Sequence, residues 1–261
     1  MSLILFSVSL ISSLIGAISG IGGGVIIKPV LDSLGVMSIS TINFLSGCTV
    51  LAMAITSLIR SKLSGKSEGI NYSITVYLAV GSALGGLLGK WIFNIIKSSV
   101  SSESIIGLIQ SIILLLINIV IIIYMKNKNK VTTLKIENKL ICILIGLVLG
   151  VVSSFLGIGG GPLNIAVLYF FLSMSAKETA INSIFIILFS QVTSLSSTVI
   201  TGSIPEFANM HLMLMCMGGI GGALLGSRLS KKMDDNKIEK FFLIVLFILS
   251  FINIINLVKF L

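Results

Sequence analysis

Long uncharged stretches separated by short charged ones dominate the chain. The uncharged runs cover residues 1–27, 33–59, 69–89, 104–125, 140–176, 179–205, 207–227 and 241–258. A transmembrane helix needs about 20 consecutive, mostly apolar residues, so each run is long enough to be considered a membrane segment. The pattern predicts an all-α polytopic membrane protein with eight membrane segments or more.

One of these runs is too long for a single helix. Residues 140–176 would form a straight helix of roughly 55 Å, whereas the hydrocarbon core of a bilayer is about 30 Å thick. Residues 157–161, with the sequence GIGGG, interrupt the run, and glycine costs a helix interior roughly 1 kcal/mol relative to alanine. Pro162 follows, and proline suits the first turn of a new helix. We therefore predict a hairpin, in which one helix ends at the glycines and a shorter one runs from Pro162 to about Met174.

The same GIGGG motif stands 137 positions earlier, at residues 20–24. The same offset pairs further residues, which are Ser46 with Ser183, Ser57 with Ser194, Gly81 with Gly218, Gly85 with Gly222, and Gly89 with Gly226. A single offset held over such a distance indicates an internal duplication. It predicts a first transmembrane repeat at residues 1–125, a basic cytoplasmic linker at 126–139 and a second repeat at 140–261. The four-residue spacing of the later glycines, with three other residues between each pair, is typical of closely packed membrane helices.

Basic loops indicate which connections face the cytoplasm. Arg60, Lys62 and Lys66 follow the second run, whereas the corresponding loop of the second repeat, residues 202–206, has no cation. One helix later the difference is reversed, because residues 228–240 are strongly basic and their counterpart is not. Both repeats obey the charge rule only if they are inverted, with five membrane-turning segments each and both termini outside. The fold prediction is thus two inverted repeats, each with a glycine-broken helical hairpin, and about 8 to 10 membrane segments. The alternative is eight simple helices in two parallel halves.

Composition excludes several classes of protein. Of the 261 residues, 55% are hydrophobic and 10% are charged, and the mean hydropathy is +1.13, whereas about a quarter of the residues in a soluble domain are charged. The net charge of +9 lies in the loops, so we expect no nucleic-acid partner. Cys48, Cys142 and Cys216 have neither metal nor disulfide spacing, and we expect no metal and no cofactor. Neither paired membrane aspartates nor a serine with a buried histidine base is visible, so we expect no enzyme.

The doubled glycine motif, with Pro29 and Leu31 after its first copy, and the two-fold repeat resemble the sulfite exporter TauE/SafE family of membrane permeases. The resemblance covers nearly the whole chain. It implies a multi-pass permease of the bacterial cytoplasmic (inner) membrane that moves small sulfur-containing or organic anions, such as sulfite and sulfonates. A homodimer is left open. The second copy departs from the pattern, since Pro162 follows the glycines directly and Ala166 stands in the place of Pro29, and this weakens any inference about the substrate.

Broken helices inside a membrane point to an anion site. Their free N-termini carry unpaired N–H groups and partial positive charge near the bilayer midplane, and glycine lets an anion approach that backbone. The candidate substrate-binding residues are Gly20, Gly22, Gly23, Gly24, Lys28, Ser46, Gly157, Gly159, Gly160, Gly161, Asn164 and Ser183.

Several of these candidates have a second interpretation. Lys28 either adds a positive charge to the site, or snorkels or lies at the membrane surface near Asp32. Ser46 and Ser183 either donate hydroxyls to the anion or bond to the backbone of their own helix. Three polar amides in apolar runs, Asn164, Asn182 and Gln191, face the protein interior and contact either substrate or another helix.

We expect alternating access around this midplane site. No Asp or Glu lies within a long uncharged run, so proton coupling has no obvious buried carboxylate. The alternatives are an anion channel and a membrane scaffold that transports nothing.

Overall fold

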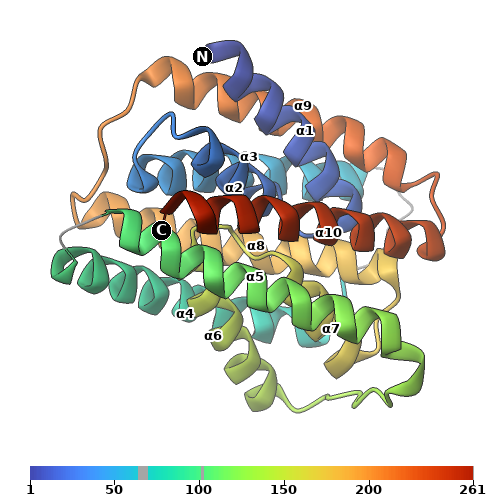
Figure 1. The fold of residues 1–261 in the computed structure, drawn as a ribbon. Coiled ribbons are helices and arrows are strands. Elements are labelled where there is room, and N and C mark those ends of the chain that lie inside the picture. The colour runs from blue at the N-terminus through green and yellow to red at the C-terminus, as the bar shows by residue number, and fades with distance from the viewer. Residues whose placement is uncertain (64–69, 101–102, 261) are drawn as a thin grey trace.

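The computed structural model describes residues 1–63, 70–100 and 103–260, and within these ranges the chain forms ten α-helices and one 3₁₀ turn (Figure 1). The elements are α1 (Ser2–Ser19), α2 (Gly24–Leu34), α3 (Ile39–Leu63), α4 (Tyr72–Ser99), α5 (Glu103–Asn127), η1 (Lys128–Lys130), α6 (Lys139–Leu156), α7 (Pro162–Leu172), α8 (Ala176–Ile200), α9 (Asn209–Ser230) and α10 (Asp235–Phe260). The all-α prediction is confirmed. Lys66, which was counted with the basic loop after the second run, lies outside the described residues.

The helices are of two kinds. Eight of those described are long and apolar enough to cross a membrane. The other two, α2 and α7, have 11 residues each, about 16 Å of helix, which is too short to cross. Each short helix follows one copy of the glycine motif. The predicted hairpin in the run 140–176 is confirmed, with a helix that ends at Leu156 and a second one that begins at Pro162.

The bundle has two ends that differ in charge. One end, which we call the basic end, carries the linker at residues 126–139 and the loop between α9 and α10. There the backbone N–H of Lys177, at the start of α8, donates to Asp235, at the start of α10, at 2.9 Å. The opposite end, which we call the terminal end, carries both termini of the chain (Figure 1). At the terminal end the Thr41 hydroxyl donates to the carbonyl of Glu206, at 3.1 Å. The linker and the loop between α9 and α10, which are both rich in lysine, therefore share one end of the molecule.

Glycines join the two halves along two long seams. In α4, a β-carbon on Gly85 would overlap the carbonyl oxygen of Leu147 in α6, so these helices touch backbone to backbone. In α9, a β-carbon on Gly222 would overlap the carbonyl oxygen of Leu10 in α1 in the same way. Both glycines and both leucines are 137 residues apart. The predicted packing role of these glycines is confirmed, and each seam joins a helix of residues 1–125 to a helix of residues 140–261.

The carboxyl ends of the short helices are held by other elements. The Lys259 ammonium of α10 donates to the carbonyl oxygens of Asp32 and Ser33 at the end of α2, at 2.9 and 3.0 Å. At the end of α7, the linker N–H groups of Leu134 and Ile136 donate to the last carbonyls, at 3.0 and 2.7 Å. The final carbonyls of a helix have no partner within it, so these contacts stabilise two short helices in apolar surroundings.

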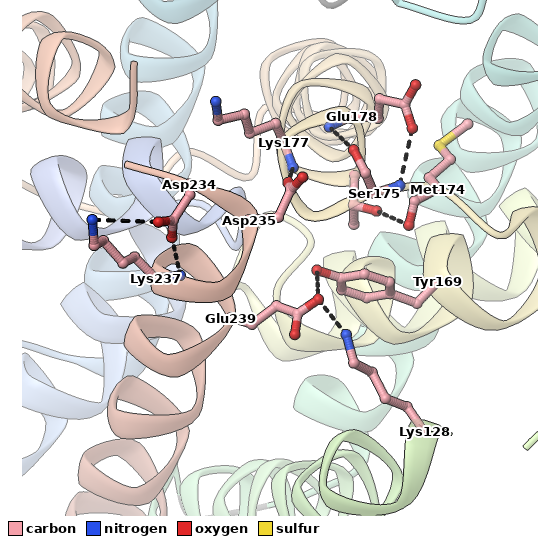
Figure 2. Close-up of polar contacts among 11 residues, drawn as sticks. Lys128, Tyr169, Met174, Ser175, Lys177, Glu178, Asp234, Asp235, Lys237 and Glu239 are labelled. Atoms are coloured by element: carbon pink, nitrogen blue, oxygen red, sulfur yellow. Dashed lines mark hydrogen bonds and ion pairs between the residues drawn. The ribbon is translucent and has the colours of Figure 1, made fainter. Parts of the chain in front are cut away.

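A polar cluster at the basic end also fixes α7 against α10 (Figure 2). Glu239 of α10 accepts a hydrogen bond from the Tyr169 hydroxyl of α7, at 3.3 Å, and forms an ion pair with Lys128 of η1. Beside it, a capping box of Ser175 and Glu178 starts α8. Contacts at the basic end therefore join η1, α7, α10 and the start of α8.

Candidate functional site

The two glycine motifs contact each other in the middle of the protein. A β-carbon on Gly24 would overlap the carbonyl oxygen of Ile158, and one on Gly22 would lie 4.0 Å from the carbonyl oxygen of Gly159. All the motif glycines are buried except Gly157, which is half-buried. The first residue of α2 thus lies directly on the second break. This contact joins two segments that the sequence separates by 137 residues.

Each break begins with a left-handed glycine. Gly20 ends α1 with φ 78°, and Gly157 ends α6 with φ 67°, a conformation that costs other L-residues free energy. Beyond these two residues, within the described part of the chain, the backbone N–H groups without a hydrogen-bond acceptor include those of Gly22, Gly23, Gly24, Gly159, Gly160 and Gly161. Unpaired N–H groups at the start of a helix carry partial positive charge and suit an anion.

Two long helices, α3 and α8, form the walls around the breaks. A β-carbon on Gly22 would lie 3.2 Å from Cδ1 of Ile187 in α8, and one on Gly159 would lie 2.9 Å from Cγ1 of Val50 in α3. Val50 and Ile187 are themselves 137 residues apart. The contact of each break with the wall helix of the other half is therefore repeated at the same offset.

A cavity of about 380 Å³ runs from the basic end toward the first break. Its lining consists of Ala17, Ser57, Ser61, Lys177, Ala180, Ile181, Ile184, Ser227, Ser230 and Lys231. We call it the basic vestibule. One lining residue, Ala180, contacts the first break, since its Cβ would lie 2.8 Å from a β-carbon on Gly20. The Ser57 hydroxyl on its wall is buried and has no hydrogen-bond partner among the described residues.

A much smaller cavity, of about 20 Å³, reaches the second break. Its lining consists of Asn43, Phe44, Gly47, Lys90, Phe93, Ser154, Gly157, Gln191, Ser194, Leu195 and Thr198. We call it the narrow pocket. At the offset of 137, Ser194 corresponds to Ser57 and Asn43 to Ala180, so the two cavities occupy equivalent positions in the two halves. One is wide in this structure and its counterpart is nearly closed.

A third cavity, of about 460 Å³, opens beside α7 at the basic end. Its lining includes the carboxylates of Glu178, Asp235 and Glu239 against one ammonium, that of Lys128 (Figure 2). Carboxylates repel an anion, so the chemistry of this cavity does not fit the predicted substrate.

Lys28 and Asp32 form an ion pair inside the protein. Their charged atoms are 2.7 Å apart, and the side chains are 1% and 4% exposed. The surface and snorkelling interpretations of Lys28 are therefore wrong, because its charge is neutralised in place by the next turn of α2. The carboxylate of Asp32 is also buried, which the sequence does not single out, although the spacing of four residues from Lys28 is a signal for such a pair.

The remaining predicted side chains are all buried. The Ser183 hydroxyl donates to the carbonyl of Gly20, at 2.6 Å, and so holds the first break against α8. The Ser46 hydroxyl has no partner among the described residues, and Asn164 is 2% exposed. The side-chain oxygen of Asn182 accepts hydrogen bonds from the backbone N–H of Asn71, just before α4, and from the Thr75 hydroxyl of α4, so Asn182 joins α8 to α4.

We expect Ser183→Ala to lower the free energy of unfolding by about 1 kcal/mol, because it removes a buried hydrogen bond and leaves the Gly20 carbonyl without a partner. Ser46→Ala is the matched control, since that hydroxyl has no partner in the described ranges and its removal should be close to neutral. Thermal unfolding of the purified proteins in detergent measures both. Equal shifts in the two variants would contradict a specific role for Ser183.

Comparison with known proteins places the chain among membrane transporters. The family described as Sulfite exporter TauE/SafE matches residues 5–252. Two curated proteins of Bacillus subtilis (strain 168) are similar over almost their whole length. One is the probable membrane transporter protein YunE, 24% identical over 95% of each chain. The other is the probable membrane transporter protein YjnA, 27% identical over 89% of this chain and 93% of its own. No solved structure is significantly similar.

Proposed function

Because the chain belongs to the sulfite exporter TauE/SafE family, whose members are transporters and not enzymes, we propose that it is a permease for a small anion. The substrate is a sulfur-containing or organic anion such as sulfite or a sulfonate. Transport takes place across the bacterial cytoplasmic (inner) membrane, by alternating access around a midplane site between the two glycine breaks.

The observation that carries this proposal is the meeting of the two breaks at the centre of the bundle. Six motif N–H groups without an acceptor among the described residues lie in these two breaks, and the basic vestibule, lined by Lys177 and Lys231, approaches the first break. Among the described residues, neither the basic vestibule nor the narrow pocket has a carboxylate in its lining. Donor groups without carboxylates favour an anion over a cation.

We further propose that residues 1–125 and 140–261 are inverted repeats. Inverted halves that pack on each other make each contact twice, with the partners exchanged. The seams between α4 and α6 and between α9 and α1 support this arrangement, because they repeat the same contacts at an offset of 137. The wide basic vestibule and its nearly closed counterpart support alternating access, in which one side opens while the other is shut.

The direct test is the flux of radiolabelled sulfite, thiosulfate and a small sulfonate into proteoliposomes. We expect saturable uptake of at least one of them above protein-free vesicles, and its loss in Gly160→Leu, where the added side chain would collide with Ile187. Gly221→Leu is the matched control, because the nearest atom to a β-carbon there is Cδ1 of Leu10 at an ordinary 3.6 Å.

The alternatives give different results in the same vesicles. A voltage-dependent conductance without saturation would identify an anion channel. If the folded protein moves none of the three anions, or if Gly160→Leu transports as well as Gly221→Leu, the midplane site is wrong and the glycines serve helix packing alone.

A further inference from the structure

Lys90 lies on the membrane-spanning helix α4, half-buried, and none of the ion pairs among the described residues includes it. Its ammonium is 5.1 Å from the centroid of the Phe93 ring. A charged side chain inside a membrane is costly unless it is paired or faces a polar cavity. Lys90 faces the narrow pocket, which also contains Gly157 of the second break.

Other polar groups in the same pocket also have no partner. The Ser154 side chain is only 6% exposed, and its hydroxyl has no hydrogen-bond partner in the described ranges. The side-chain oxygen of Asn43, next to Gly157, is buried as well and has no hydrogen-bond partner among the described residues. Gln191 is 4% exposed and lines the pocket from α8. A buried polar group without a partner costs free energy, so these groups indicate a ligand that is not always in place.

The polarity of the narrow pocket differs from that of the basic vestibule. Lys90 corresponds to Ser227 at the offset of 137, and Ser154 corresponds to Ala17, so the pocket carries a deep lysine and an extra hydroxyl that its counterpart lacks. Lys97 lies two turns farther along α4, toward the terminal end, where its ammonium donates to the Ser40 hydroxyl at 2.7 Å. Two cations therefore lead from the terminal end to the second break.

We propose that the narrow pocket is a second anion site, in which Lys90, Ser154 and Gln191 bind the substrate oxoanion when the protein opens toward the terminal end. This inference rests on the proposed function and deepens it, because it assigns the residues that receive the anion on the side opposite the basic vestibule. A cavity of about 20 Å³ holds one water at most, so the pocket seen here is the closed form of that site.

Cysteine labelling tests the pocket without knowledge of the substrate. In a background without the free cysteines Cys48, Cys142 and Cys216, a single cysteine is placed by Ser194→Cys or, as the matched control, by Ser57→Cys at the equivalent position in the basic vestibule. Two membrane-impermeant methanethiosulfonates of similar size are compared, one with a sulfonate and one with a trimethylammonium group.

We expect Ser57→Cys to react from the basic end, and Ser194→Cys to react from the terminal end at a rate about tenfold lower, because the pocket must first open. At Ser194→Cys the sulfonate reagent should be favoured over the cationic one by about tenfold relative to their rates with a free thiol, which corresponds to one nearby charge. Lys90→Met should remove that preference, and Lys90→Arg should keep it. Labelling of Ser194→Cys only from the basic end, or a preference unchanged by Lys90→Met, would overturn the proposal.

Flux measured in proteoliposomes in which the protein has one known orientation tests the second anion site separately from transport itself. For radiolabelled sulfite, Lys90→Met should raise the KM at the terminal end by about tenfold and leave the KM at the basic end within about twofold, since only one side uses Lys90. Lys240→Met, which removes an exposed lysine at the basic end, controls for net charge. Equal changes at both ends would overturn the second site. If the wild-type protein moves no anion but Ser194→Cys still reacts preferentially with the sulfonate reagent, the narrow pocket binds anions and the proposed transport function is wrong.

Discussion

Replacing Gly24 with alanine is expected to reduce anion flux to less than about one-tenth of wild type, because the two breaks can no longer touch. The added methyl group would overlap the carbonyl oxygen of Ile158 and lie 2.9 Å from Cγ2 of Val50. The first of these obstacles is backbone, so the second break must move as a whole. Overpacking of this kind costs about 1–3 kcal/mol of stability, and at this position it also displaces the N–H groups that we propose for the anion.

Gly24 is well suited to this test because its backbone is not left-handed. Alanine introduces no conformational strain there, so the effect comes from the contacts of the added methyl group with Ile158 of the second break and with Val50 of α3. Gly221→Ala, in the helical part of α9, places its methyl group at an ordinary contact distance of 3.6 Å from Cδ1 of Leu10. It should keep full flux and gain stability, since alanine favours a helix by about 1 kcal/mol over glycine. Flux in proteoliposomes, with thermal unfolding of the same preparations, measures both variants. A Gly24→Ala protein that transports normally would contradict a site between the two breaks.

Removing one member of the Lys28–Asp32 pair is expected to destabilise the protein by about 3–5 kcal/mol. In Lys28→Met, the carboxylate of Asp32 remains in the interior, and its second oxygen already has no partner among the described residues. The double variant Lys28→Met/Asp32→Leu should recover most of the loss, because no buried charge is left over. Chemical unfolding of the single and double variants in detergent checks this prediction.

The flux of the double variant then decides the role of Lys28. We expect it to stay within a few-fold of wild type, because the ammonium of Lys28 is neutralised at 2.7 Å by Asp32 and the pair stabilises α2. A double variant that is stable but transports nothing would instead retain Lys28 as a substrate-binding residue. A double variant no more stable than Lys28→Met would contradict the ion-pair explanation itself.

The candidate site was predictable only in part. The motif glycines and Pro162 stand out in the sequence because they interrupt apolar runs, and the structure brings the two motifs together. Ser183 was found through the repeat, although its observed partner is the carbonyl of Gly20. Lys90, Asn43 and Ser154 were not among the candidates, since each lies on a long helix where nothing in the local pattern distinguishes a cavity-lining residue from one packed against a neighbouring helix.

The sequence by itself determined that this is an all-helical membrane protein, and where its helices break. These features are local, because hydropathy, the cost of glycine in a helix and the fit of proline in a first turn each act over a few residues. Only the tertiary structure decided that the two breaks touch, that Asp32 is buried beside Lys28, and that one vestibule is wide while its counterpart is narrow. These features depend on how helices far apart in the chain pack against each other, and the periodicity of a single segment does not contain that information.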